Sequence, residues 1–117
     1  MLKIERIYRD LIQSFETGEQ GTFKVYFAKR TKIDHIRAFV IKPIAGTDNG
    51  TLTFKNSTGS SMSGGLVTAT ASDPISTAYL ATPTTNNEVA AGDYIQIVAA
   101  KTTAGGRLQV MIDGHEF

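Results

Sequence analysis

The chain has 117 residues, of which 41% are hydrophobic, and it carries a formal net charge of +1. A chain of this length buries roughly two-thirds of the surface that it exposes when unfolded, so we expect one domain with its own core. Because the chain has no cysteine, disulfide bonds and thiolate metal sites are excluded as the means of holding that core together.

The charges are divided unevenly along the chain. Residues 1–42 hold nine Lys and Arg against five Asp and Glu, a balance of +4, and the remainder holds three against six, a balance of −3. A basic half can attract an acidic partner, but interleaved acids are typical of a solvated surface. We find no apolar run long enough to span a membrane and no apolar stretch of a secretory signal, so we expect synthesis in the cytoplasm.

Residues 1–20 contain the one pattern that fits a helix. The same residues could instead form an extended arm, and Gly18 and Gly21 would end either structure. We expect this segment to dock on a partner or on sister subunits, or to cover the domain's own sandwich, which follows over residues 21–117. The apolar residues spaced for one face of a helix, and therefore the candidate docking residues, are Ile4, Ile7, Tyr8, Leu11, Ile12 and Phe15.

From Thr22 onward, apolar residues alternate with polar ones, as strands with one buried face require. Pro43, the Asp73-Pro74 pair and the polar residues between the apolar runs supply turn signals. The polar, glycine-rich residues 56–65 are expected to form an exposed loop. The sequence predicts strands at residues 22–28, 33–41, 51–55, 66–71, 94–99 and 107–112, and a weaker strand or a connecting segment at 75–82.

About seven to eight short strands separated by turns are typical of an all-β fold, an antiparallel β-sandwich or jelly roll. No helix-sized crossover separates the strands, so a parallel α/β sheet is not expected. The side chains expected to share one face of their strands are Ile36, Ala38 and Val40, then Ile95 and Ile97, and then Leu108, Val110 and Ile112.

The chain offers few side chains suited to catalysis. His35 follows Asp34 in a predicted strand, where neighbours point to opposite faces, so we expect a hydrogen-bonded strand histidine. His115 lies between Asp113 and Glu116, a weak metal site at best, and we expect a solvated C-terminal tail there. We therefore expect no enzymatic activity, no cofactor and no metal.

The most basic stretch of the chain contains Lys29, Arg30 and Lys32. It is short, and only Tyr26 and Phe27 lie nearby for stacking on bases, which favours a solvated turn over a nucleic-acid site. These three basic residues remain candidates for contact with a protein partner.

Four runs of the sequence resemble small structural proteins of tailed bacteriophages. They read AFVIKPIAGTDNGTLTF at 38–54, SMSGGLVT at 61–68, TPTTNNEVAAGDYIQI at 82–97 and TTAGG at 102–106. These phage proteins are β-sandwich or jelly-roll domains found on the capsid as head decoration (cement) proteins or as bases of head fibres. The resemblance implies a virion protein that binds the major capsid protein on the capsid surface, often as a trimer, and that decorates or stabilises the capsid.

A second class of function fits the same fold. Small β-sandwiches often bind carbohydrate or a receptor through aromatic residues beside polar loops, and Tyr79 and Tyr94 lie near such loops. A carbohydrate- or receptor-binding module of a phage or bacterial surface is therefore the alternative. Neither nucleic acid nor a membrane is expected as a partner.

Overall fold

The computed structural model of the protein describes residues 5–117, which form nine β-strands. All strand pairs are antiparallel. Within this range no helix is long and apolar enough to cross a membrane. The strands are β1 (Arg6–Ser14), β2 (Gly21–Tyr26), β3 (Thr31–Lys42), β4 (Gly50–Lys55), β5 (Ser61–Ala69), β6 (Ala78–Ala81), β7 (Glu88–Val89), β8 (Tyr94–Ala100) and β9 (Arg107–Glu116).

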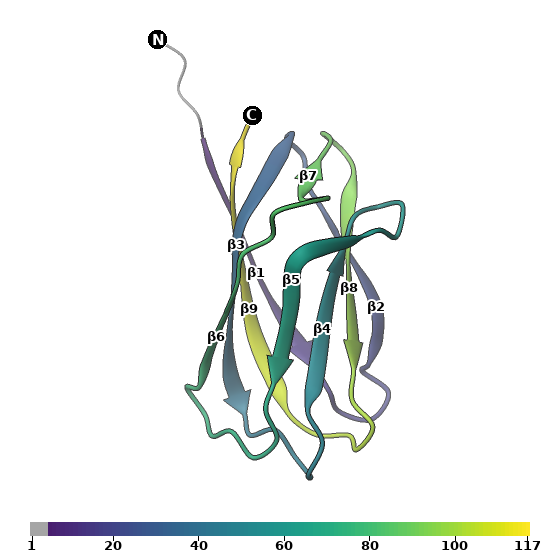
Figure 1. The fold of residues 1–117 in the computed structure, drawn as a ribbon, viewed down its shortest axis with the longest axis vertical. Coiled ribbons are helices and arrows are strands. Elements are labelled where there is room, and N and C mark those ends of the chain that lie inside the picture. Colours follow the sequence, from purple (N-terminus) through teal and green to yellow (C-terminus); the bar gives the residue numbers. More distant parts are fainter. Residues whose placement is uncertain (1–4) are drawn as a thin grey trace.

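The strands form two sheets that pack face to face (Figure 1). Sheet A has the strand order β1-β9-β3-β6, and β7 also pairs with β3. Sheet B has the order β2-β8-β4-β5. The antiparallel β-sandwich that the sequence predicts is therefore confirmed.

The core lies between the two sheets, where every second side chain of the inner strands is buried. The three sets of residues expected to share a face do so, and each of these side chains is buried. The largest of them that are fully enclosed include Ile36, Ile95, Ile97, Leu108 and Ile112.

Two strands and two strand ends were not predicted. β1 and the two-residue β7 are additional strands, and β5 begins at Ser61, so the loop predicted at 56–65 is wrong for its second half. The pairing of Ser61 with Lys55 extends β5 past an irregularity that no local pattern reveals. The solvated C-terminal tail is also wrong, because β9 continues to Glu116 and pairs there with both β1 and β3.

The helical alternative for the N-terminal segment is wrong for residues 6–14, which form β1 and pair with β9 along their whole length. A spacing of four residues suits a helix but is also an even number, so it keeps two side chains on one face of a strand. Ile7 and Leu11 accordingly pack against the core, whereas Tyr8 and Ile12 point outward. Ile4 lies outside the described residues.

Phe15 fills the core at the end of β1. Its side chain is 0% exposed, its N–H donates to the Gly106 carbonyl at 2.9 Å, and its carbonyl accepts from the Gly105 N–H at 2.8 Å. A Cβ at Gly50 would come within 2.7 Å of the Phe15 ring, so glycine at that position leaves the ring its space. This burial removes Phe15 from the candidate docking residues.

A buried ion pair joins the β3–β4 loop to the β8–β9 loop. The Lys101 side chain is 0% exposed and its Nζ lies 2.8 Å from Asp48 Oδ1. The Thr103 N–H donates to Asp48 Oδ2 at 3.0 Å. The hydrogen bond from Lys101 holds the pKa of Asp48 well below its ordinary value of 3.8.

The Phe15→Ala variant is expected to lose about 3–5 kcal/mol of unfolding free energy, because it leaves a cavity in a closed core. The Leu66→Ala variant is the matched control, since Leu66 lies in a strand but is 55% exposed, and its unfolding free energy is expected to change by about 0.5 kcal/mol or less. Equilibrium urea unfolding measures both. Similar losses for the two variants would contradict the placement of Phe15.

The Asp48→Asn variant is expected to melt at a clearly lower temperature than wild type, because it leaves the Lys101 ammonium buried without its counter-ion. The Lys101→Met variant should lower the melting temperature less than Asp48→Asn does, because the partly exposed Asp48 carboxylate can be hydrated. Since the pKa of Asp48 is lowered by folding, the pair stabilises the wild type fully above pH 3.8 and loses this effect as the pH falls below that value. Calorimetry from neutral pH to below pH 3.8 should therefore show that the difference in melting temperature between wild type and Asp48→Asn becomes smaller as the pH falls.

Candidate functional site

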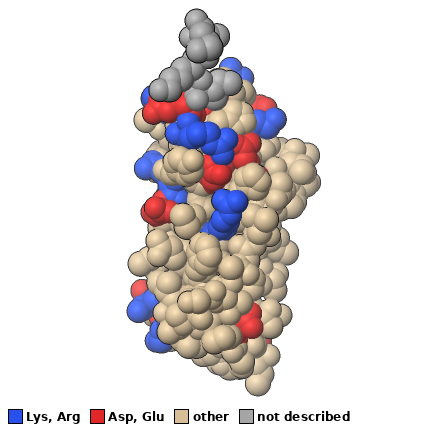
Figure 2. Space-filling view, turned by 90° about the vertical axis from the view of Figure 1, so that its left-hand side faces the viewer, with Lys and Arg blue, Asp and Glu red and all other residues tan. Residues whose placement is uncertain are grey.

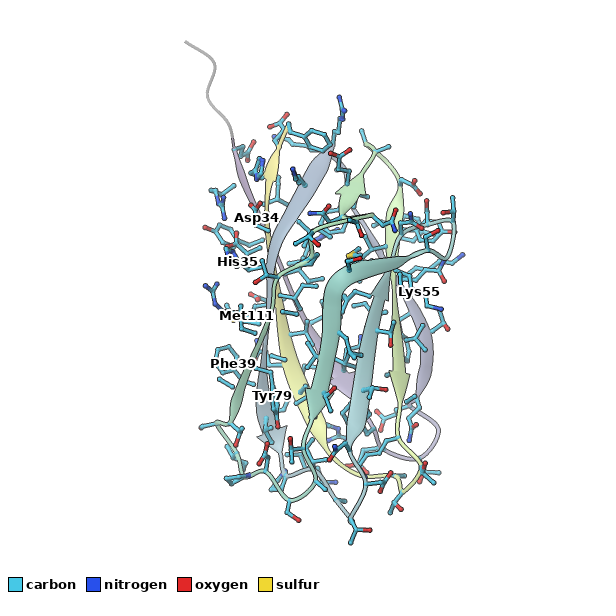
Figure 3. The ribbon with its side chains drawn as sticks, in the orientation of Figure 1. Asp34, His35, Phe39, Lys55, Tyr79 and Met111 are labelled. Atoms are coloured by element: carbon cyan, nitrogen blue, oxygen red, sulfur yellow. The ribbon has the colours of Figure 1, made fainter. Side chains whose placement is uncertain are left out.

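The outer face of sheet A carries a group of exposed apolar side chains. Residues paired across neighbouring strands share a face, so the register brings together side chains from four strands. In Figure 3, Met111 and Phe39 lie along the margin of the molecule that this face forms. We name the set the apolar outer face, and it consists of Tyr8, Ile12, Phe39, Leu80 and Met111.

Four of the five members of the apolar outer face are exposed, and Phe39 is half-buried. Tyr8 is 65% exposed, Ile12 and Leu80 are each 61% exposed, and Met111 is 38% exposed. Figure 2 shows that charged side chains gather toward one end of this side of the molecule and that a broad area with few charges lies beyond them. Several large apolar side chains exposed on one face of a sheet indicate an interaction site.

The outer face of sheet B has a different character. Its register aligns mainly threonine, lysine and glutamine side chains, which a strand presents to water at little cost. Sheet B also exposes Leu66 and Tyr26, so the two faces differ in degree, and sheet A exposes the larger number of apolar side chains. The polar side chains of the sheet B face include Thr22, Lys24, Thr51, Thr53, Lys55, Thr68 and Gln96.

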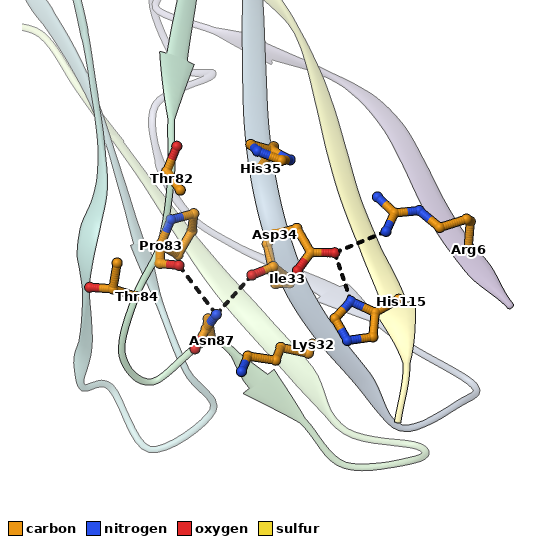
Figure 4. Close-up of a pocket in the computed structure, with 10 residues that line it drawn as sticks. All are labelled: Arg6, Lys32, Ile33, Asp34, His35, Thr82, Pro83, Thr84, Asn87 and His115. Carbon is orange, nitrogen blue, oxygen red and sulfur yellow. Dashed lines mark hydrogen bonds and ion pairs between the residues drawn. The ribbon is translucent and has the colours of Figure 1, made fainter. Parts of the chain in front are cut away.

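An irregularity in β3 places two neighbouring polar side chains on the same face. The register of β3 against β9 shifts between Ile33 and His35, which leaves Asp34 as the extra residue of a β-bulge. Asp34 Oδ2 lies 2.7 Å from His115 Nδ1 and 3.3 Å from a guanidinium nitrogen of Arg6 (Figure 4). Asp34 and His35 thus both reach the outer face, and the expectation that they point to opposite faces is wrong.

Arg6 links Asp34 to a second carboxylate. Its other terminal nitrogen lies 2.6 Å from Asp113 Oδ1, and the Asp113 side chain is only 15% exposed. His35 Nδ1 is 3.8 Å from Asp113 Oδ2 and finds no hydrogen-bond partner in the described chain, contrary to the expectation of a hydrogen-bonded histidine. We name Arg6, Asp34, Asp113 and His115 the charge cluster.

A shallow hollow of about 510 Å³ lies beside the charge cluster (Figure 4). The buried amide of Asn87 forms part of its wall and donates to the Ile33 carbonyl at 2.8 Å, which ties the loop before β7 to β3. Lys32 also lines the hollow. The nearby carboxylates are already bound by Arg6 and His115, and no group of three His, Asp or Glu residues suited to a metal ion occurs in residues 5–117.

The predicted basic residues lie at the end of the sandwich where β1 begins. The Lys29 ammonium pairs with Glu5, and this hydrogen bond raises the pKa of Lys29. The Arg30 guanidinium stacks 4.2 Å from the ring centroid of Phe117, while the Arg30 residue itself is exposed. With Lys32 at the hollow, we name these three residues the basic end, although Glu5, Glu88 and Glu116 lie among them.

Of the apolar docking residues predicted from the sequence, the structure places Tyr8 and Ile12 on the apolar outer face. Phe39, Leu80 and Met111 were missed. The signal for Phe39 and Met111 was present, since each lies between two buried residues of its own strand and must face outward. The sequence alone does not predict the strand order that brings the five residues of the apolar outer face together.

The tyrosines considered for carbohydrate binding are engaged within the chain. The Tyr79 hydroxyl donates to the Asp73 carboxylate and accepts from the Thr70 N–H, and burial together with the Asp73 hydrogen bond raises the pKa of Tyr79 to about 12. The Tyr94 ring packs on Tyr26 with 5.2 Å between centroids. Neither contact adds support to the carbohydrate-binding alternative.

No protein-family model and no curated protein matches the chain. Three solved structures are remotely similar to it. A protein of the extra small virus particle of the prawn Macrobrachium rosenbergii is 11% identical over 100% of this chain and 82% of its own, with a TM-score of 0.39. A Bacillus endospore appendage protein of disulfide-linked pili is 13% identical over 97% of this chain and 89% of its own, and its TM-score is also 0.39.

The third structure is a chain of the T13 IBDV viral particle. It is 12% identical over 97% of this chain and 35% of its own, with a TM-score of 0.30. All three similarities are too remote to assign this chain a family or a function.

The Arg6→Gln variant is expected to exchange the backbone amides of residues 113–116 faster than wild type. It removes the cation shared by Asp34 and Asp113, which otherwise joins β1, β3 and the end of β9. Hydrogen exchange followed by mass spectrometry measures the change, with Lys55→Gln on sheet B as the control. Unchanged exchange at 113–116 would mean that the cluster adds nothing measurable to that end of the sheet.

Proposed function

We propose that the protein is a bacteriophage virion structural protein that binds the outside of an assembled capsid and decorates or stabilises it. Its partner is the major capsid protein. The protein acts by assembly and not by catalysis.

The observation that carries an assembly role is the apolar outer face of sheet A. Its side chains stay exposed on a closed sandwich whose core is already filled, so they do not serve the fold of the single chain. Covering such surface gains about 25 cal/mol for each Å² of apolar area removed from water. The outer face of sheet B exposes fewer large apolar side chains, Leu66 and Tyr26 among them, so covering it gains less.

The choice of a capsid as the assembly rests on the resemblance to phage head proteins in residues 38–54, 61–68, 82–97 and 102–106. These runs supply β7 and parts of β3, β4, β5 and β8, with several of the loops that connect them. The sandwich itself is compatible with many functions. The capsid assignment therefore needs a direct binding test.

We assign the contact with the capsid to the basic end, that is, to Lys29, Arg30 and Lys32. The three residues lie where β2 turns into β3, so the sandwich holds them in fixed positions. Arg30 is exposed and Lys32 lines an open hollow. Clustered positive charge speeds association with an acidic surface and sets the orientation of docking.

The wild-type protein is expected to co-sediment with empty capsids of the virus that encodes it and to saturate at a fixed ratio to the major capsid protein. The Arg30→Glu/Lys32→Glu double variant should bind at least about 10-fold more weakly, because it reverses two charges at the contact. The Lys24→Glu/Lys55→Glu variant makes the same change in net charge on sheet B and should bind like wild type.

The absence of co-sedimentation at any ratio would exclude the proposed function. Equal weakening of both double variants would keep capsid binding but remove the basic end as the contact. Gradient centrifugation followed by quantitative gel analysis distinguishes these results.

A further inference from the structure

Two exposed residues of opposite charge flank the centre of the apolar outer face. The register pairs Met111 of β9 with Asp10 of β1 on one side and with Arg37 of β3 on the other. Both flanking residues are exposed, and within residues 5–117 neither forms an ion pair. A negative and a positive side chain thus lie in one row, on opposite sides of the same methionine.

In the next row, two apolar side chains flank β9 in place of the two charged ones. Gln109 of β9 is paired with Ile12 on the β1 side and with Phe39 on the β3 side. Rows on one face are about 7 Å apart along a strand, and neighbouring strands are about 4.8 Å apart. Each flanking side chain therefore lies at nearly the same distance from β9.

This arrangement is complementary to itself. A two-fold axis in front of the face, inclined by about 15° to β9, makes the two sheets cross at about 30° and places the β1 side of one copy over the β3 side of the other. Asp10 then faces Arg37 of the second copy, and Ile12 faces Phe39 of the second copy, each contact occurring twice. Met111 and Gln109 lie on the axis and meet their own counterparts.

We propose that the apolar outer face of sheet A binds a second copy of the same chain across this two-fold axis. The inference rests on the proposed assembly function and names the partner of this face. A capsid protein would need only a complementary surface of its own, whereas pairing with a second copy requires each side of β9 to match the other. The rows of Met111 and Gln109 meet that requirement.

The geometry of packed sheets allows these contacts. Aligned sheets pack about 10 Å apart and cross at about 30°. Because of this crossing, a side chain one strand spacing from the axis is shifted by about 3 Å along the strand relative to its partner in the second copy. A long side chain such as Arg37 can span that shift. Two rows away, at Arg6 and Lys32, the displacement is about 8 Å, so these cations do not meet across the axis.

The charge cluster lies one to two rows beyond Met111, and Asp113, which is on β9, falls near the axis, where the Arg6 guanidinium of its own chain at 2.6 Å offsets its charge. Asp34 and Asp113 are bound by Arg6 and His115 within their own chain, so they need no partner from the second copy. Asp34 can remain hydrated while the apolar rows are buried. The contact closes with two copies, in contrast to the trimer that the resemblance implies.

The test is a charge reversal measured by sedimentation velocity over a range of protein concentrations. Wild type is expected to be a dimer. Asp10→Arg places two cations opposite each other, and Arg37→Asp places two anions opposite each other, so each variant should raise the dimer dissociation constant about 100-fold. The Asp10→Arg/Arg37→Asp double variant restores both pairs and should dimerise like wild type.

Mixing the two single variants tests the symmetry directly. In a mixed dimer, the arginine introduced at position 10 of one chain meets the aspartate introduced at position 37 of the other, and the native Asp10 and Arg37 form the second pair. Two monomeric variants should therefore form a dimer only when combined. Lys24→Asp on sheet B is the control and should leave the wild-type dimer intact, and circular dichroism checks that each variant is folded.

A cross-link supplies a measurement that does not depend on charge reversal. The chain has no cysteine, so Met111→Cys introduces a single thiol on the proposed axis. A short bis-maleimide reagent should join two Met111→Cys chains and should not join two Leu66→Cys chains, whose thiol lies on sheet B.

A wild-type monomer at all concentrations would overturn the inference, and so would a trimer, dimerisation of both single variants, or failure of the mixture to pair. None of these results affects the co-sedimentation of the chain with capsids, which tests the proposed function separately. A failure of the dimer is thus distinguishable from a failure of the capsid assignment.

Discussion

The pairing of β9 with β1 on one side and with β3 on the other determines both faces of sheet A. The alternation of β9 sends Leu108, Val110 and Ile112 into the core and leaves Gln109 and Met111 on the outside. Because β1 and β3 are in register with the same strand, their outward side chains fall into common rows. The apolar outer face is therefore a direct consequence of this central strand, although its members come from distant parts of the chain.

The bulge at Asp34 divides that face into two regions. A regular strand would have sent either Asp34 or His35 inward, into a core that has no place for a charge. The extra residue instead keeps both outside and brings Asp34 to Arg6 and His115. The charges at this end are paired within the chain, whereas the remaining part of the face combines apolar side chains with the exposed Asp10 and Arg37.

The sequence was sufficient for the strands that carry a regular alternation, and seven of the nine were predicted because their buried side chains occur at every second position. It was insufficient for β1, because the spacing of Ile7 and Leu11 fits both a helix and a strand, and only pairing with β9 decides between them. The charge cluster and the apolar outer face depend on strand order and on a bulge. Neither has a local signature, so residues as distant as Arg6 and Asp113 could not be brought together from the sequence.

The direction of the two-fold axis relates the proposed pairing to the proposed capsid contact. An axis close to the direction of β9 stacks the two sandwiches face to face with the same ends together, so the basic ends of both copies face the same direction. Lys29, Arg30 and Lys32 of one copy then lie beside those of the other, next to the ends of β1 and β9. Two linked contacts bind more tightly than either contact alone, since the second forms at a high effective concentration. A weak basic contact, repeated in a dimer, can thus hold the protein on a large regular surface without a deep binding pocket.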